Sequence, residues 1–105
     1  MLNESTKNSL KILGGVQDFT ETIGSRKGIE FSFNNSLKSN YCKLIEYKGS
    51  GQDQDRYIIQ LRKISKDPFT QEEKDRLVYE SIIKEQEFNE VFEKETGIYL
   101  SMYLN

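Results

Sequence analysis

Side chains that commonly carry catalysis are sparse in this 105-residue chain. The sequence contains no histidine, which removes the commonest general base, the commonest metal ligand and the imidazole-dependent triads. Cys42 is the single cysteine, so it can form neither an internal disulfide nor a thiolate zinc site. Its apolar neighbours on an expected strand favour a buried and inert thiol.

Carboxylates are the remaining candidates for acid–base chemistry. They gather at an expected helix start and along an expected solvated helix face: Glu72, Glu73 and Asp75, and then Glu90, Glu93 and Glu95. No pair lies in an apolar setting of the kind that drives two carboxylates to different ionisation states. Gly14-Gly15 follows an expected helix instead of opening one, so it does not form a phosphate-binding loop. The sequence therefore predicts a protein that is not an enzyme and that holds no cofactor or metal.

Length and composition narrow the class of protein. A chain of 105 residues with 35% hydrophobic residues, including six Phe and six Tyr, is expected to fold as one domain with one core. A lone cysteine suits a reducing compartment. The sequence has neither a basic-then-apolar leader nor a long apolar run, so we expect a cytoplasmic protein with no membrane partner.

Charge is divided unevenly along the chain. The formal net charge is −2, yet residues 1–66 hold eleven Lys and Arg against seven Asp and Glu. Residues 67–105 hold four Lys and Arg against ten Asp and Glu. The sequence thus predicts a basic part and an acidic part, although glutamate-rich solvated helix faces would give the same count.

Hydrophobic periodicity predicts an α+β domain: a short N-terminal helix, a three-stranded antiparallel meander and a long C-terminal helix packed on one sheet face. The expected helices are 4–13 and 71–96, and the expected strands are 29–33, 40–48 and 56–64, with 16–23 either a fourth, edge strand or a loop. Thr70 and Glu73 have capping-box spacing for the long helix. Residues 84–87 interrupt its apolar stripe, so a bend or a second helix start is expected there.

Two local features are also predicted. The apolar alternation of the strand at 40–48 changes parity before Tyr47, which predicts a β-bulge near residue 45 or 46. Gly97 is expected to end the C-terminal helix in a left-handed conformation. Ile98, Leu100, Met102 and Leu104 then alternate with polar or aromatic residues, so this tail is expected to dock on the body.

Three stretches resemble a family of small uncharacterised proteins of bacteriophages and prophages. They are residues 10–15 (LKILGG) with Phe19, residues 40–44 (NYCKL) and, most specifically, residues 90–101 (EVFEKETGIYLS). The resemblance implies a helix, a three-stranded meander and a C-terminal helix, and a protein that acts in the cytoplasm of a bacterial host. Small phage accessory proteins are often inhibitors of host defence, among them anti-CRISPR proteins.

Two binding surfaces follow from the charge pattern. Carboxylates spaced along the C-terminal helix could occupy a cationic groove built for nucleic acid on a host defence protein such as an RNA-guided nuclease. Their residues are Glu80, Glu87, Glu90 and Glu93. The alternative is nucleic-acid binding by a basic sheet with interleaved tyrosines, through Lys38, Lys43, Lys48, Arg56, Arg62 and Lys63.

Overall fold

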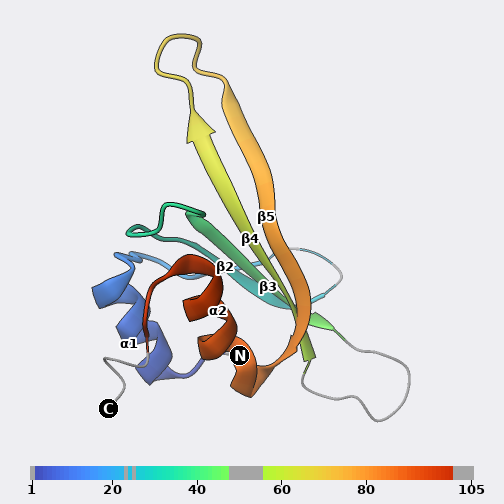
Figure 1. Ribbon diagram of the computed structural model, residues 1–105. Coiled ribbons are helices and arrows are strands. Elements are labelled where there is room, and N and C mark those ends of the chain that lie inside the picture. The colour runs from blue at the N-terminus through green and yellow to red at the C-terminus, as the bar shows by residue number, and fades with distance from the viewer. Residues whose placement is uncertain (1, 23, 25, 48–55, 101–105) are drawn as a thin grey trace.

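Each strand of the sheet pairs with the strand that follows it in the chain. The computed structural model describes residues 2–22, 24, 26–47 and 56–100. Its elements in order are α1 (Glu4–Leu13), β1 (Thr20–Glu21), β2 (Gly28–Ser32), β3 (Tyr41–Tyr47), β4 (Arg56–Lys66), β5 (Glu73–Lys84), the 3-10 helix η1 (Glu85–Glu87) and α2 (Phe88–Thr96). The strands form one antiparallel sheet in the order β1-β2-β3-β4-β5 (Figure 1). The predicted α+β class is confirmed, but the sheet has five strands instead of three or four.

Helix α1 begins and ends where the sequence predicts. The side chain of Asn3 caps it, because Asn3 Oδ1 accepts a hydrogen bond from the Thr6 amide at 2.8 Å. At the other end the Gly14 amide donates to the Leu10 carbonyl at 2.9 Å. The next residue, Gly15, adopts φ +63°, a left-handed conformation that glycine accepts without a Cβ penalty. These contacts turn the chain from α1 toward the sheet.

Strand β5 replaces the first half of the predicted C-terminal helix, so the prediction of a helix over 71–96 is wrong. Val78, Tyr79 and Ile82 are β-branched or aromatic, and such side chains pack well on a pleated surface. The pairing with β4 extends over the length of both strands, which satisfies backbone groups that the helix would have satisfied internally. The chain becomes helical only after Lys84, first as η1 and then as α2.

Residues 67–72 form the loop between β4 and β5. Asp67 Oδ1 accepts hydrogen bonds from the amides of Phe69 at 2.8 Å and Thr70 at 3.3 Å. The Asp67 amide donates to the Glu72 carbonyl at 2.8 Å and closes the turn. The hydroxyl of Thr70 accepts from the amide of Glu72, so the capping box predicted with Glu73 does not form. A side-chain-stabilised turn has taken the place of the predicted helix start.

The β-bulge predicted near residue 45 or 46 is also wrong. Strand β3 pairs with β4 without a shift, and Glu46 lies opposite Tyr57 while Tyr47 lies opposite Arg56. Tyr47 is partly buried on the sheet face away from the helices, so it needs no extra residue to bring it to the core. The register shift that the structure does contain lies between β4 and β5, next to Leu61.

Both helices contribute to a core on one face of the sheet (Figure 1). The rings of Phe33 and Phe92 meet edge to face with centroids 5.2 Å apart, which joins β2's extension to α2. The buried apolar residues are Leu10, Val16, Phe31, Phe33, Cys42, Leu44, Tyr57, Ile59, Leu61, Ile83, Phe88, Phe92, Ile98 and Leu100. Their strand members alternate in sequence, as a sheet buried on one face requires.

Helix α2 ends as predicted. Gly97 adopts φ +80°, and its amide donates to the Glu93 carbonyl at 2.8 Å. Ile98 and Leu100 are then buried while Tyr99 is 58% exposed, so the start of the tail alternates and docks as expected. Met102 and Leu104 lie outside the described residues.

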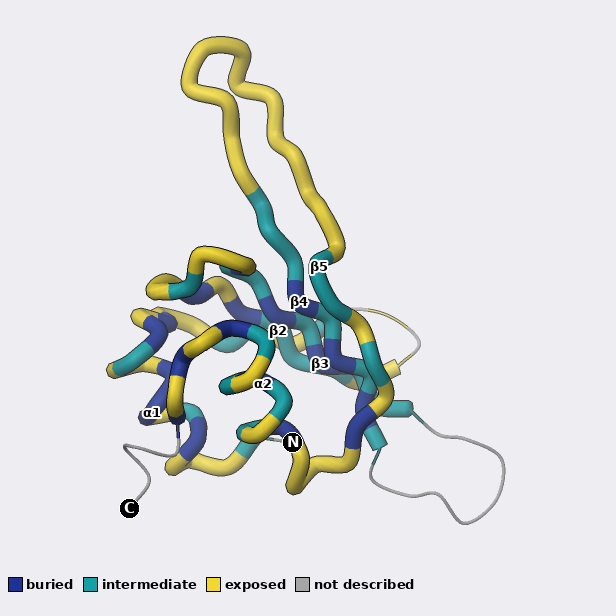
Figure 2. The backbone as a smooth tube through the Cα atoms, viewed as in Figure 1, coloured by how far each residue is buried: buried dark blue, intermediate teal, exposed yellow. Residues whose placement is uncertain are grey.

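A two-stranded arm projects from the body. We define the arm as residues 62–77, the distal part of β4, the loop and the distal part of β5 (Figure 1). Strand β3 accompanies β4 only as far as Tyr41 opposite Arg62, and the side chain of Asn40 extends the contact by two bonds to Ile64. Figure 2 shows that most of the arm is exposed. The molecule is correspondingly elongated, with extents of 50 × 35 × 21 Å.

Candidate functional site

In the described residues both helices lie on the same face of the sheet, and no helix lies on the other face. Cys42, Leu44 and Ile59 point to the helices, so the residues between them in sequence point the other way. We call this second surface the helix-free face, and its members on β3, β4 and β5 are Tyr41, Lys43, Ile45, Tyr47, Arg56, Ile58, Gln60, Arg62, Leu77, Glu80, Ile82 and Lys84. It combines apolar, aromatic and charged side chains.

A row of isoleucines crosses the centre of the helix-free face. Ile45 lies opposite Ile58, and Ile58 lies opposite Ile82. Ile82 is 50% exposed, and the other two are partly buried by their neighbours in the sheet. Antiparallel sheets that face water usually carry polar residues on the open side, so an aliphatic row there is unusual. We call it the isoleucine row.

Charged and polar residues border the isoleucine row on both sides. One neighbouring row consists of Tyr47, Arg56 and Lys84, and the other consists of Lys43, Gln60 and Glu80. An apolar centre with a polar rim is the usual composition of a protein–protein interface. The helix-free face therefore has the composition of a docking surface.

Hydrogen bonds order the end of this face near β1. The Glu30 carboxylate accepts from the Tyr41 hydroxyl and, at 3.2 Å, from the Thr22 hydroxyl. Burial, together with the hydrogen bond and the negative charge of Glu30, raises the pKa of Tyr41 well above its ordinary value. Tyr41 therefore remains neutral and acts as a donor that ties β3 to β2.

The structure brings together part of the predicted basic site. Lys43, Arg56 and Arg62 share the helix-free face with Tyr41 and Tyr47. Lys63 lies on the opposite face of β4, Lys38 lies in the exposed loop before β3, and Lys48 lies outside the described residues. The guanidinium of Arg62 already forms an ion pair with Asp75 Oδ1 at 3.2 Å and donates a hydrogen bond to Gln60 Oε1 at 3.3 Å.

The predicted acidic helix does not exist as one surface. Glu80 is on β5, where its carboxylate accepts from the Gln60 side chain. Glu87 is in η1 and accepts from the Lys84 amide at 2.8 Å, which stabilises the start of the helical segment. Only Glu90 and Glu93 lie on α2. Because half of the expected helix is a strand, these four carboxylates do not form a single rigid row.

The groups considered for catalysis lie apart. Cys42 is fully buried, and burial raises the pKa of its thiol, so the thiol stays protonated. Glu72, Glu73 and Asp75 are exposed near the end of the arm. Within the described parts of the chain, no group of three His, Cys, Asp or Glu residues lies close enough to hold a metal ion.

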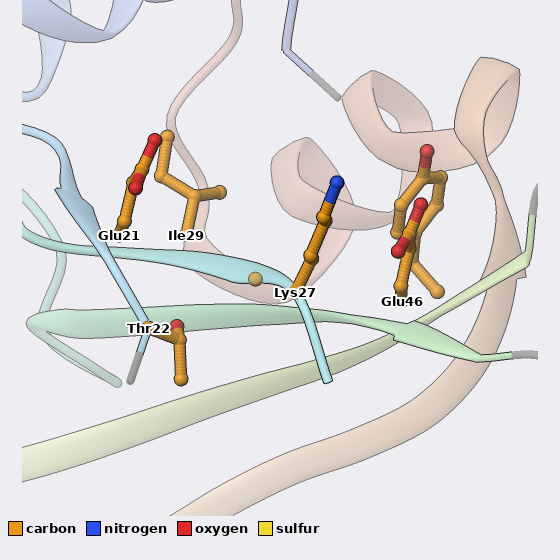
Figure 3. A pocket seen from close by; sticks show the side chains of 7 residues that line it. Glu21, Thr22, Lys27, Ile29 and Glu46 are labelled. Atoms are coloured by element: carbon orange, nitrogen blue, oxygen red, sulfur yellow. The ribbon is translucent and has the colours of Figure 1, made fainter. Parts of the chain in front are cut away.

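A hollow of about 470 Å³ lies beside β2 and β3, lined by Glu21, Thr22, Lys27, Gly28, Ile29, Glu46 and Tyr57. Figure 3 shows Glu21, Lys27 and Glu46 pointing to the same side, whereas Thr22 points away. Glu46 reaches the hollow because β3 has no bulge, which places it opposite Tyr57 on the helix side. The charged groups that point to this side are one ammonium and two carboxylates, while the Thr22 hydroxyl lies on the other side.

The isoleucine row is the feature that sequence interpretation missed. A helix over 71–96 would place Ile82 on its apolar stripe, and the row becomes visible only once the register of three strands is known. A signal was present in the adjacent pairs Ile58-Ile59 and Ile82-Ile83. Two consecutive aliphatic residues in a strand place one on each face of the sheet.

Comparison with protein-family models, with curated proteins and with solved structures finds no match for this chain. In the part of the chain that the structure describes, neither helix is both long and apolar enough to cross a membrane.

Proposed function

We propose that this chain is a non-enzymatic, phage-encoded inhibitor that binds a host defence protein through its helix-free face. The most concrete target is an RNA-guided nuclease, which would make the chain an anti-CRISPR protein. The observation that carries the proposal is the isoleucine row, Ile45–Ile58–Ile82, which is partly exposed and has a polar and charged border on each side. The phage origin rests on the resemblance of residues 10–15, 40–44 and 90–101 described above.

The isoleucine row is unfavourable in contact with water and would contribute to the free energy of binding a partner. Burying apolar area contributes about 25 cal/mol per Å², so three aliphatic side chains left partly in water represent binding free energy that a partner would recover. The sheet also holds them rigidly, since each residue of the row is fixed by pairing with its neighbour. A preorganised apolar centre loses little conformational entropy on binding.

The contact surface proposed here differs from the acidic helix expected from sequence. Glu90 and Glu93 lie together on α2, whereas Glu80 lies on β5 and points to the helix-free face of the sheet. Reversing the charges of Glu90 and Glu93 together is therefore expected to leave partner binding unchanged. A loss of binding in that variant would show that the partner contacts α2.

The experiment is capture from a bacterial lysate on the immobilised chain, with mass spectrometry of the bound proteins. We expect recovery of a defence protein, and we expect the purified chain to reduce the activity of that protein in a cleavage assay. The variant Ile58→Lys should lose both effects, while Leu37→Lys, at a 99% exposed loop position, should retain them. Capture that is equal for both variants would contradict the use of the helix-free face.

Nucleic-acid binding through the same face is the second candidate. It is favoured by the gathering of Lys43, Arg56 and Arg62 beside Tyr41 and Tyr47, which suits phosphate contact and base stacking. Binding to a labelled single-stranded oligonucleotide should then weaken steeply with salt and in the double variant Lys43→Ala plus Arg62→Ala. Absence of binding at low salt would dismiss this candidate.

A further inference from the structure

The two faces of the arm differ in charge. Lys63 lies directly opposite Arg76, and Lys74, two residues from Arg76, lies opposite Ser65 on the same face. Leu61 belongs to this face too, so it continues the helix side of the sheet beyond the body. We call Lys63, Lys74 and Arg76 the cationic face of the arm.

The other face of the arm has balanced charge. Arg62 pairs with Asp75 at 3.2 Å, and Lys66 lies opposite Glu73. On the cationic face, by contrast, none of the three side chains makes an ion pair or hydrogen bond with the residues that the structure describes. Like charges placed directly opposite in an antiparallel pair destabilise the pair. The arm therefore carries cations that its own fold does not neutralise.

An aromatic residue stands at the end of the arm. Phe69 is 92% exposed in the loop, next to Pro68. The carboxylate nearest to Phe69 in sequence, that of Asp67, accepts hydrogen bonds from the amides of Phe69 and Thr70, so it points back into the loop. An exposed apolar ring at the tip of a projecting ribbon is the kind of side chain that stacks on a base or enters a base step.

From these features we propose that the arm binds duplex DNA. The cationic face contacts backbone phosphates, and Phe69 contacts bases at the end of the ribbon. The major groove of B-form DNA is about 12 Å wide and admits a two-stranded β-ribbon. At about 3.3 Å per residue, the strand from Arg62 to Lys66 is about 13 Å long, and the loop with Phe69 extends the ribbon further along that groove. The major groove of A-form RNA is deep and narrow, so RNA is a poorer fit.

This inference does not rest on the proposed function, because it uses the opposite face of the sheet and a different part of β5. An acidic protein is the other class of partner that the cationic face of the arm would attract. The ribbon shape and the exposed ring favour DNA, and the acidic partner is an outcome of the test.

The test measures fluorescence anisotropy of a labelled DNA duplex over a range of salt concentrations. The wild-type chain should bind at low salt, and Lys63→Gln plus Arg76→Gln should bind at least tenfold more weakly. Loss of two phosphate contacts should also reduce the slope of log K against log salt by about two. Phe69→Ala should weaken binding about fivefold or more while leaving the salt slope unchanged.

The matched control is Lys11→Gln plus Lys94→Gln, which removes two exposed cations from the two helices and should leave duplex binding unchanged. Four results would overturn the proposal. They are no binding of the duplex at low salt, loss of binding only in the control, equal binding of an RNA duplex, and tighter binding of poly-glutamate than of DNA. Circular dichroism of each variant should match the wild type, since the substituted residues are not in the core.

Discussion

Ile58 lies directly opposite Ile82 in the β4–β5 ladder, on the side of the sheet that neither helix covers. The residues that follow them in sequence, Ile59 and Ile83, are buried in the core on the side that the helices cover. Two adjacent isoleucines on each strand therefore serve different purposes. One of each pair is buried in the core, and the other lies on the helix-free face.

This division predicts different stabilities for two neighbouring variants. Ile59→Ala removes a fully buried side chain and should lower the free energy of unfolding by about 2–5 kcal/mol. Ile58→Ala, on the open face, should lower it by less than about 1.5 kcal/mol because the space it leaves is accessible to water. Urea denaturation followed by circular dichroism measures both. A larger loss for Ile58→Ala would mean that the two faces have been assigned the wrong way round.

The left-handed turn after α2 gives a second prediction. Gly97→Ala should destabilise the protein by about 1 kcal/mol, because φ +80° is unfavourable for a residue with a Cβ although no atom obstructs it. Gly24→Ala is the control, since Gly24 also has open space and its φ is not left-handed. That variant should change the free energy of unfolding by less than about 0.5 kcal/mol. Equal effects in thermal denaturation would contradict the assigned role of Gly97.

A third prediction concerns pH. Burial raises the pKa of the Cys42 thiol, so the folded protein keeps a proton that the unfolded chain releases above about pH 8.5. The stability from this group is fully present below that pH and is lost as the pH rises. We expect the free energy of unfolding to decrease toward about pH 9.5, by at most about 1.4 kcal/mol per pH unit from this group.

The variant Cys42→Val should lack this decrease in the free energy of unfolding. Chemical denaturation at several pH values measures the free energy of unfolding for both proteins. The range stops below the ordinary pKa of tyrosine, about 10, because Tyr41 also has a raised pKa and would add a decrease of the same sign above it. A variant with the same pH dependence as the wild type would show that Cys42 is not the group responsible.

Much of the fold follows from sequence patterns that local physics determines. The cap at Asn3, the glycines after Leu13, the alternation around Phe31 and the stop at Gly97 each depend on neighbours within a few residues. These elements were predicted with the correct type. The α+β class and the docking of the first residues of the tail followed from them.

Strand β5 could not be predicted in the same way. Leu77, Val78, Ile82 and Ile83 fit one face of a helix, and they also fit a strand that is apolar on both faces. The choice depends on pairing with β4, which is a tertiary contact. The isoleucine row depends on the register of three strands, and the cationic face depends on a register shift next to Leu61. Neither surface is visible until the strands have been aligned.

The most direct test of whether the helix-free face is the contact surface compares two isoleucines with nearly the same exposure. Ile82, on the helix-free face, is 50% exposed, and Ile12, on α1, is 54% exposed, so Ile82→Glu and Ile12→Glu make the same chemical change at similarly exposed positions. The measurement is the dissociation constant for the captured defence protein, by calorimetry. We expect Ile82→Glu to weaken binding at least a hundredfold and Ile12→Glu to leave it within twofold of wild type. Unchanged binding of Ile82→Glu, with its fold intact, would show that the helix-free face is not the contact surface.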